Sequence, residues 1–222
     1  MALIASHLPF LDACHRHGLI GSPTWTLGSQ QFLDPQAAGL SAGSGAADLF
    51  RARYGVEEYL DFDLNDDADV QLDLAAALPP ERRHGAATVL EAGTLEHVFH
   101  LGDALRTVHE MIRPGGAFVA LVPVSWWNHG FVNLNPRLLA GFGLANGYEP
   151  VLEGFLFRVS MPGVGVKAWT VFTRDGEVRP RTRLWVDRLL NRALPARTLY
   201  LAALRKNDDR PFTTPTDVFP NW

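Results

Sequence analysis

Four polar side chains fall within one short stretch of the chain, VLEAGTLEHVF at residues 89–99: Glu91, Thr94, Glu96 and His97. The stretch begins with apolar residues typical of a buried strand and ends in a pattern typical of a helix's first turn. Carboxylates and imidazoles can transfer protons or hold ligands, and they are costly to bury unless they are paired or face a cleft. We therefore predict that these groups line a cleft at the end of a strand.

Each of these residues also has a simpler interpretation. Glu91 can pair with a nearby arginine. Glu96 and His97 can belong to the first turn of a helix, where a carboxylate favours the positive end of the helix dipole. The sequence leaves both interpretations open, and we take Glu91 and His97 as candidate catalytic residues.

A further candidate, His129, follows the next apolar segment and lies directly after a Trp-Trp-Asn sequence. A histidine pKa near 6.5 suits removal of a proton from a hydroxyl or amine at neutral pH. His129 is therefore the predicted general base. By contrast, His100 and His109 fall in a predicted helix, where we expect them on the exposed surface.

Alternating strands and helices would hold these side chains in place. Apolar residues at helical spacing predict helices within residues 7–19, 47–55, 100–112 and 135–149. Short apolar runs bounded by turn residues predict strands over residues 24–28, 56–64, 68–74, 86–92, 117–124, 155–161 and 197–205. Gly55 and Gly147 are expected to end the helices that precede them, and Asn135 to be an N-cap. This order implies an α/β, Rossmann-like doubly wound fold, with a mostly parallel seven-stranded sheet and helices on both faces.

The 222 residues suit a single domain. We expect its core at 20–158 and 197–206, an insertion at 159–196 between strands six and seven, and an extended tail at 207–222. The insertion contains a predicted amphipathic helix at 181–194 among several arginines. Its basic face can be solvated surface, or it can meet an acidic partner or a membrane surface.

Composition excludes several classes of function. The net charge of −4 and the pI near 6.0 argue against non-specific nucleic-acid binding. The single cysteine, Cys14, rules out an intramolecular disulfide, and no apolar run reaches the ~18 residues of a membrane span. The N-terminus has no basic start and carries His, Asp and Arg, unlike a secretory signal. We therefore expect a soluble cytoplasmic protein.

Two parts of the sequence carry enough donor groups to suggest a metal ion. Cys14, His15 and His17 offer too few ligands at poor spacing for a metal site. The acidic run from Asp61 to Asp73 could bind a hard cation, but ligand hydroxyl groups and solvation explain it more simply. The sequence therefore predicts no bound metal.

The predicted sheet also indicates where a ligand binds. In open α/β sheets, ligands lie beyond the carboxyl ends of the strands. That edge would bring together residues 28–31, Asp61, Asp63, residues 91–97 and residues 124–129. We therefore expect a binding site formed by these junctions.

Two segments of the sequence resemble a known family. GTLEHVFHLGDALRTVHEMIRPGGAFVALVP, residues 93–123, is similar to the second half of class I S-adenosylmethionine-dependent methyltransferases. In that family a strand end runs into LEHV, then a helix ending in Pro-Gly-Gly, then the next strand. NHGFVNLNPRLLAGFGLANGYE, residues 128–149, resembles the segment that follows. The resemblance covers about residues 22–150 and implies the family's fold, the cofactor S-adenosylmethionine and methyl transfer to a small-molecule acceptor.

The resemblance also implies cofactor-binding residues. Gly28, Ser29 and Gln30 would form the turn that cradles the aminocarboxypropyl end of the cofactor through backbone N–H groups. Asp63 would accept from both ribose hydroxyls, with Asp61 as the competing candidate two residues earlier.

The resemblance assigns the rest of the cofactor to two further junctions. Asp73 would accept from the adenine amino group while the backbone of Leu74 reads the ring edge. Ala92 and Gly93 would let the backbone approach the sulfonium side.

The sequence departs from the family pattern at the first of these junctions. Of the usual Gly-x-Gly-x-Gly turn, Gly28 remains, with Gln30 and Phe32 where further glycines are expected.

The main hypothesis is an enzyme that methylates a hydroxyl, amine or carboxylate of a small metabolite of natural-product or glycan type. The alternative is a methyltransferase-fold protein that no longer transfers methyl groups and acts as a binding or assembly partner. A nicotinamide dehydrogenase is disfavoured, because no Gly-x-Gly-x-x-Gly follows the first strand. Assembly into a homo-oligomer is left open.

Overall fold

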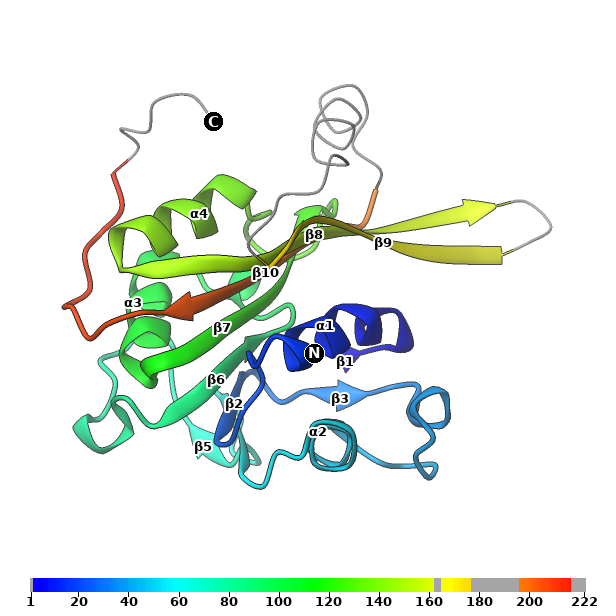
Figure 1. Cartoon of the computed structure of the whole chain (residues 1–222), viewed down its shortest axis with the longest axis horizontal. Coiled ribbons are helices and arrows are strands. Elements are labelled where there is room, and N and C mark those ends of the chain that lie inside the picture. The colour runs from blue at the N-terminus through cyan, green and yellow to red at the C-terminus, as the bar shows by residue number, and fades with distance from the viewer. Residues whose placement is uncertain (1, 162–164, 177–195, 217–222) are drawn as a thin grey trace.

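The central feature of the computed structural model is a sheet flanked by helices (Figure 1). The model describes residues 2–161, 165–176 and 196–216. The helices are α1 (Leu8–Arg16), α2 (Ala46–Tyr54), α3 (Leu101–Met111) and α4 (Pro136–Ala145). The strands are β1 (Ala2–Leu3), β2 (Thr24–Leu27), β3 (Gln31–Phe32), β4 (Tyr59–Asp63), β5 (Val70–Gln71), β6 (Ala86–Glu91), β7 (Ile112–Ser125), β8 (Tyr148–Met161), β9 (Gly165–Asp175) and β10 (Thr198–Lys206).

The strand order of the main sheet is β5-β4-β2-β6-β7-β10-β8-β9. Every pair from β5 to β7 is parallel, whereas β10 lies antiparallel between β7 and β8. The predicted mostly parallel α/β sheet is therefore confirmed, although among the described residues it has eight strands where the sequence predicts seven.

The eighth strand, β9, comes from the segment predicted as an insertion. It pairs antiparallel with β8, and the Arg174 guanidinium on β9 donates to the Glu153 carboxylate on β8 at 2.9 Å. Figure 1 shows this pair of strands extending beyond the rest of the sheet. The predicted helix at 181–194 lies outside the described residues.

Helices cover both faces of the sheet, and alternation along the strands explains why. On β7, Phe118 and Val122 face the core formed with α3 and α4, whereas Val119 and Leu121 face the core formed with α1 and α2. Side chains of successive strand residues point to opposite faces, so an uninterrupted apolar run supplies two cores at once. The doubly wound arrangement follows from this pattern.

The ends of two helices match their predicted capping residues. Gly55, at φ +68°, ends α2 in the left-handed conformation. The side chain of Asn135 accepts from the Arg137 backbone N–H at 2.9 Å at the start of α4. These local signals fix the helix boundaries because each satisfies backbone groups that a helix end leaves unpaired.

Both chain ends are bonded to other parts of the protein. At the N-terminus, β1 pairs in parallel with β3 in a separate two-stranded sheet, which the sequence does not predict. At the other end, residues 207–216 form neither helix nor strand, and the backbone of this segment bonds to the side chains of His109 and Asn146. His109, predicted to be on the surface, is 2% exposed, because its Nε2 bonds to the backbone oxygen of Arg210 at 2.8 Å.

Among the described residues, no helix is both long enough and apolar enough to cross a membrane.

Candidate functional site

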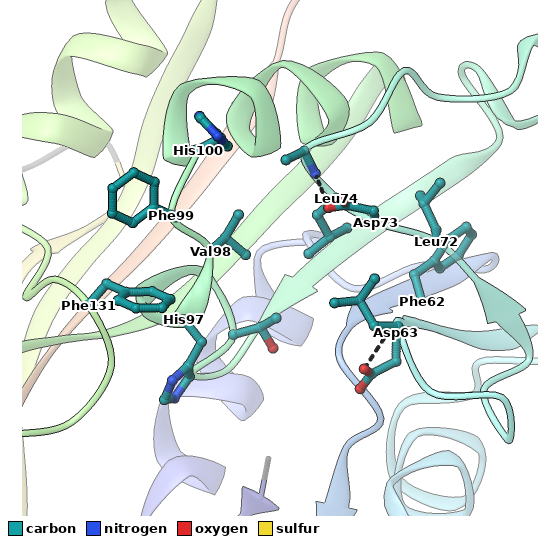
Figure 2. Close-up of a pocket in the computed structure, with 13 residues that line it drawn as sticks. Phe62, Asp63, Leu72, Asp73, Leu74, His97, Val98, Phe99, His100 and Phe131 are labelled. Carbon is teal, nitrogen blue, oxygen red and sulfur yellow. Dashed lines mark hydrogen bonds between the residues drawn. The ribbon is translucent and has the colours of Figure 1, made fainter.

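A cavity of about 360 Å³ opens at the carboxyl edge of the sheet, beyond β4, β5 and β6 (Figure 2). Carboxylates and apolar groups from the β4 and β5 ends form one wall, and the segment after β6 forms the other. The lining residues are Phe62, Asp63, Leu64, Leu72, Asp73, Leu74, Ala75, Thr94, His97, Val98, Phe99, His100 and Phe131.

Of the two competing carboxylates on β4, Asp63 lines this cavity and Asp61 does not. Asp61 is held in a reciprocal pair, in which its Oδ1 accepts from the Asp69 N–H at 2.7 Å and its N–H donates to Asp69 Oδ2 at 3.1 Å. Oδ2 of Asp63 accepts from the Ser29 N–H at 2.8 Å, and Oδ1 accepts from the Leu64 N–H at 2.7 Å and, over a longer distance of 3.4 Å, from the Asn65 N–H. A carboxylate oxygen has two lone pairs, so Oδ2 keeps a full acceptor position for a ligand.

The far end of the cavity combines a carboxylate with apolar walls. Asp73 accepts from the Ala75 N–H at 2.9 Å, which folds the chain into a tight turn. Leu74, Leu72 and Val98 line the cavity beside it. This combination suits a flat heterocycle that offers one donor group.

The turn after β2 requires its glycine. Gly28 has φ +73°, and a Cβ there would lie 2.5 Å from Oγ1 of Thr94. That hydroxyl donates to the Leu27 carbonyl at 2.6 Å, so β2 and the segment after β6 are tied together at this point.

Ser29 and Gln30, predicted to bind the cofactor, are both bonded within the protein. The Ser29 N–H donates to Asp63, and the Gln30 amide donates to the Leu27 carbonyl at 2.9 Å. Gln30 is 8% exposed, and its Oε1 has no partner among the described residues. The chain then enters β3 rather than a helix, and neither Ser29 nor Gln30 lines the first cavity or a second one described below.

Glu91 shapes the segment after β6 from within the protein. Its Oε1 accepts from three consecutive N–H groups: Gly93 at 2.7 Å, Thr94 at 2.6 Å and Leu95 at 3.2 Å. Glu91 is fully buried, and burial together with the neighbouring Glu96 raises its pKa to about 8. Glu91 lines neither this cavity nor the second one described below. Its carboxyl group instead holds the backbone of Gly93 and Thr94, which line them.

A second cavity, of about 260 Å³, lies on the other side of the same segment. Ala92 and Gly93 line it, and Gly93 has φ +95°. The full lining is Ala2, Ile4, His7, Leu33, Ala92, Gly93, Glu96, Leu121, Trp126, His129 and Leu199.

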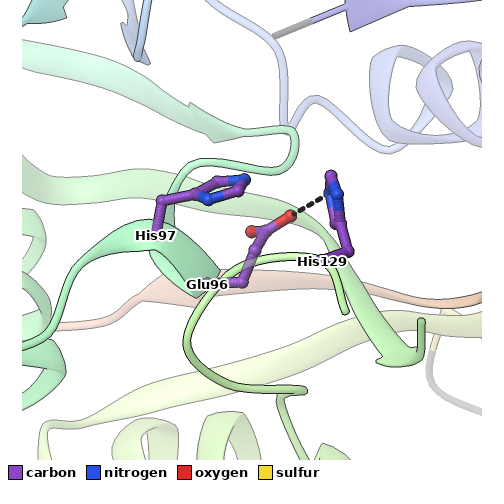
Figure 3. A group of neighbouring side chains, drawn as sticks. All are labelled: Glu96, His97 and His129. Carbon is purple, nitrogen blue, oxygen red and sulfur yellow. Dashed lines mark ion pairs between the residues drawn. The ribbon is translucent and has the colours of Figure 1, made fainter. Parts of the chain in front are cut away.

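Between the two cavities, Glu96, His97 and His129 come together (Figure 3). The His129 Nε2 lies 3.3 Å from Glu96 Oε1, and the two imidazole rings meet edge to face at 5.0 Å. Burial raises the pKa of Glu96 to about 7. Burial, reinforced by His129, lowers the pKa of His97.

The loop after β7 presents His129 by packing against Glu96. A Cβ on Gly130, at φ +71°, would lie 2.6 Å from the Glu96 carbonyl oxygen, which also accepts from the Phe131 N–H at 2.7 Å. Trp126 stacks on the His129 ring at 4.2 Å. The ring is therefore fixed in place by contacts on both sides.

Several lining residues have no counterpart in the sequence analysis. Ala2, Ile4 and Leu33 reach the second cavity because β1 pairs with β3, and no local pattern signals that pairing. Phe99 and Phe131 meet edge to face at 5.7 Å at the mouth of the first cavity. Both rings are largely exposed.

The sequence matches no protein-family model, and no curated protein matches it significantly. Solved structures, however, share its fold. A SAM-dependent methyltransferase from Archaeoglobus fulgidus is 14% identical, with 90% of this chain and 94% of that chain covered and a TM-score of 0.52. The chain has a class I methyltransferase fold.

Two further structures share this methyltransferase fold. The 1,6-didemethyltoxoflavin-N1-methyltransferase of Burkholderia thailandensis is 15% identical over 92% of this chain and 79% of its own, with a TM-score of 0.50. The N-methyltransferase NodS from Bradyrhizobium japonicum is 12% identical over 91% and 86%, also with a TM-score of 0.50. Both structures contain S-adenosylhomocysteine.

Proposed function

We propose that this protein transfers a methyl group from S-adenosylmethionine to a hydroxyl, amine or carboxylate of a small molecule. The observation that carries the proposal is Asp63, a carboxylate that lines a cavity at the carboxyl edge of a methyltransferase-fold sheet. A second cavity lies on the other side of residues 93–97, where an acceptor can approach. Two structures of the same fold contain S-adenosylhomocysteine, which supports the choice of cofactor.

The residues present fit the nucleoside part of this cofactor. Asp63 would accept from both ribose hydroxyls, and Asp73 with the Leu74 backbone would take the adenine edge, between the apolar side chains of Leu72 and Val98. Asp61 is not part of this assignment, because its carboxylate is bonded to Asp69.

The fit at the aminocarboxypropyl end differs from the family pattern. Ala92 and Gly93 allow close approach of the β6 backbone, and Gly28 keeps the β2 turn tight. Gln30 borders neither cavity, and its amide donates to the Leu27 carbonyl, so it supports the turn from within the protein. We therefore propose that the backbone at Gly28, Ala92 and Gly93 receives this end of the cofactor.

The cofactor supplies an electrophilic methyl group, so the main work of the protein is to align the acceptor. His129 lines the second cavity and contacts Glu96, which supports a proposed role in taking a proton from an acceptor that arrives protonated. His97 borders the first cavity beside it. Glu91, a candidate catalytic residue on sequence grounds, is instead proposed to position residues 93–95.

The second cavity limits the acceptor to a small molecule. Its volume of about 260 Å³ is slightly below the roughly 300–1,000 Å³ that is usual for ligand pockets. Aliphatic side chains and the Trp126 ring line most of it, with polar groups from His129, Glu96 and His7. We propose an apolar or sugar-like acceptor of natural-product or glycan type that presents one nucleophilic group.

Calorimetric titration with S-adenosylhomocysteine tests the proposal. The wild-type chain is expected to bind with micromolar affinity. Replacing Asp63→Asn should weaken binding about 10- to 100-fold, because hydrogen bonds to a charged group contribute about 1.5–3 kcal/mol. The matched control, Asp61→Asn, alters a carboxylate outside the cavity and should bind as the wild type does. No binding at millimolar ligand would contradict the proposal.

A second candidate function is a methyltransferase-fold protein that acts as a binding or assembly partner. It is favoured by the turn after β2, where the Ser29 N–H and the Gln30 amide donate within the protein. The same titration separates the two, because this candidate predicts no cofactor binding. Two expectations from the sequence stay predictions: a cytoplasmic location and no binding of nucleic acid. Whether the chain forms a homo-oligomer is left open by the sequence.

A further inference from the structure

We infer that Glu96, His97 and His129 form a binding site for a divalent transition-metal ion. From the sequence we predict no bound metal, because Cys14, His15 and His17 offer too few ligands and the acidic run from Asp61 to Asp73 has a simpler explanation. Metal binding stands on the geometry below, whereas the role of the metal in catalysis rests on the proposed function.

The donor atoms are close enough to share one ion. One nitrogen or oxygen from each residue lies within 4.8 Å of the others, and His129 Nε2 is 3.3 Å from Glu96 Oε1. Ligands at about 2.0–2.2 Å from a metal lie about 3–3.5 Å apart at tetrahedral or octahedral angles. The His129–Glu96 pair already has this separation, and the His97 nitrogen, within 4.8 Å of both, would move closer on binding the ion.

The Glu96 carboxylate is buried in a way that calls for a positive partner. Glu96 is 1% exposed, and its Oε2 has no hydrogen-bond partner among the described residues. Figure 3 shows the carboxylate between the two imidazole rings. A buried carboxylate is costly unless it is paired or ligates a metal, and the His129 contact accounts for one of its two oxygens.

Both segments are held rigidly enough to present a preformed site. Glu96 and His97 lie in a 3-10 turn, Leu95–His97, whose preceding backbone is fixed by Glu91. The carbonyl of Glu96 also accepts from the Phe131 N–H, which ties the loop of His129 to the same residue. Ligands supported by such contacts need little rearrangement to bind.

The donor set selects the class of ion. Two imidazoles and one carboxylate suit first-row ions such as Zn²⁺, Mn²⁺, Fe²⁺, Co²⁺ or Ni²⁺, whereas Ca²⁺ and Mg²⁺ prefer oxygen ligands. Three protein ligands leave at least one coordination position open. Glu96 and His129 border the second cavity, so the open position is accessible to an oxygen or nitrogen of the acceptor.

This site changes the role of His129 in the proposed reaction. With Nε2 bound to the ion, His129 is a ligand and no longer the base. An acceptor hydroxyl bound at the open position has a lowered pKa, so its O–H bond breaks, the electron pair stays on oxygen and the proton passes to water. The acceptor is thereby held and activated by the same ion.

The test is calorimetric titration of the untagged, chelator-treated full chain with Zn²⁺, and with Co²⁺ monitored by its visible absorption. We expect one ion per chain at micromolar or tighter affinity. His97→Ala, His129→Ala and Glu96→Gln should each weaken binding at least about 10-fold. His100→Ala, an exposed histidine in the same segment, is the matched control and should bind as the wild type does. Near-ultraviolet circular dichroism confirms that each variant is folded.

The outcomes separate this inference from the proposed function. Asp63→Asn should bind the ion normally while its binding of S-adenosylhomocysteine is weakened. Ion binding without S-adenosylhomocysteine binding by the wild type would support the metal site and contradict the methyltransferase proposal. If the wild type binds no ion, or if the three ligand variants bind as the His100→Ala control does, the metal inference is wrong. In that case Glu96 and His129 form an ion pair, and turnover should be insensitive to chelators.

Discussion

Glu91 and Glu96 are both buried glutamates of the same segment, yet their surroundings give them different roles. Three consecutive backbone N–H groups converge on Oε1 of Glu91, so this carboxyl group determines the shape of the chain. Glu96 turns its carboxylate toward His129 at the edge of a cavity. A buried carboxyl group engaged by backbone donors is structural, and one facing a cavity beside two imidazoles is suited to chemistry.

Gly28 provides a prediction at the scale of one residue. Gly28→Ala should destabilise the protein by about 2–4 kcal/mol, because it adds both left-handed strain and a clash with Thr94 Oγ1. Gly39→Ala is the matched control: it has nearly the same φ, +75°, with nothing within 4 Å of the added Cβ. It should cost about 1–2 kcal/mol. Urea unfolding of both variants measures the difference, and equal losses would show that the Thr94 contact is unimportant.

At the scale of elements, α3 and α4 are tied together by the chain that follows β10. The Asn146 side chain, at the end of α4, exchanges two hydrogen bonds with the backbone of Thr213, at 2.6 and 3.0 Å. His109, in the last turn of α3, bonds to the backbone of Arg210 and to the hydroxyl of Tyr148. The segment 207–216 is therefore part of the packed structure although it forms neither helix nor strand.

This arrangement predicts a pH dependence of stability. Burial lowers the pKa of His109, and the nearby Lys206 lowers it further, against the opposing effects of the Arg210 backbone bond and Asp209. The folded pKa is thus below the unfolded value of about 6.5, so the unfolded chain binds more protons as pH falls. The contribution of His109 is fully present above about pH 6.5 and declines below it.

The comparison with His109→Gln isolates this effect from the other histidines. The wild type should be more stable at pH 7.5, and the difference in unfolding free energy should narrow as the pH is lowered below about 6.5. Urea unfolding across about pH 5.5 to 7.5 measures it. A difference that stays constant over this range would show that His109 does not titrate differently on folding.

At the scale of the whole molecule, the sheet organises two cavities around one segment. Residues 93–97 follow the central strand β6 and separate the cavity at β4 and β5 from the cavity at β7 and the N-terminus. The residues between the cavities therefore follow β6, a strand in the middle of the sheet. The outer walls of the cavities lie at or near the short strands β1, β3 and β5.

Amide hydrogen exchange should show that the central strands are more protected than the short outer strands. The amides of β6 and β7, which are paired on both sides within the sheet, should exchange only through global unfolding. Those of β5, a two-residue edge strand, and of β1 and β3 should exchange by local opening, with far lower protection. Equal protection of β5 and β6 would contradict this account.

The sequence by itself determined the features that depend on local chemistry. Apolar spacing predicted the helices and most strands, Gly55 and Asn135 ended or began helices as their conformational and hydrogen-bonding preferences require, and the polar residues after β6 reached a cavity. These features follow from neighbouring residues, because hydrophobic periodicity and capping act over a few positions.

Only the tertiary structure decided which distant groups meet. It placed Asp63 rather than Asp61 at the cavity, and it brought His129 to Glu96 from a different loop. It also determined that residues 207–216 cover His109 and that Ala2 and Ile4 line the second cavity. Contacts between segments far apart in the chain are fixed by how the strands are ordered and the loops packed, and no local pattern encodes that arrangement.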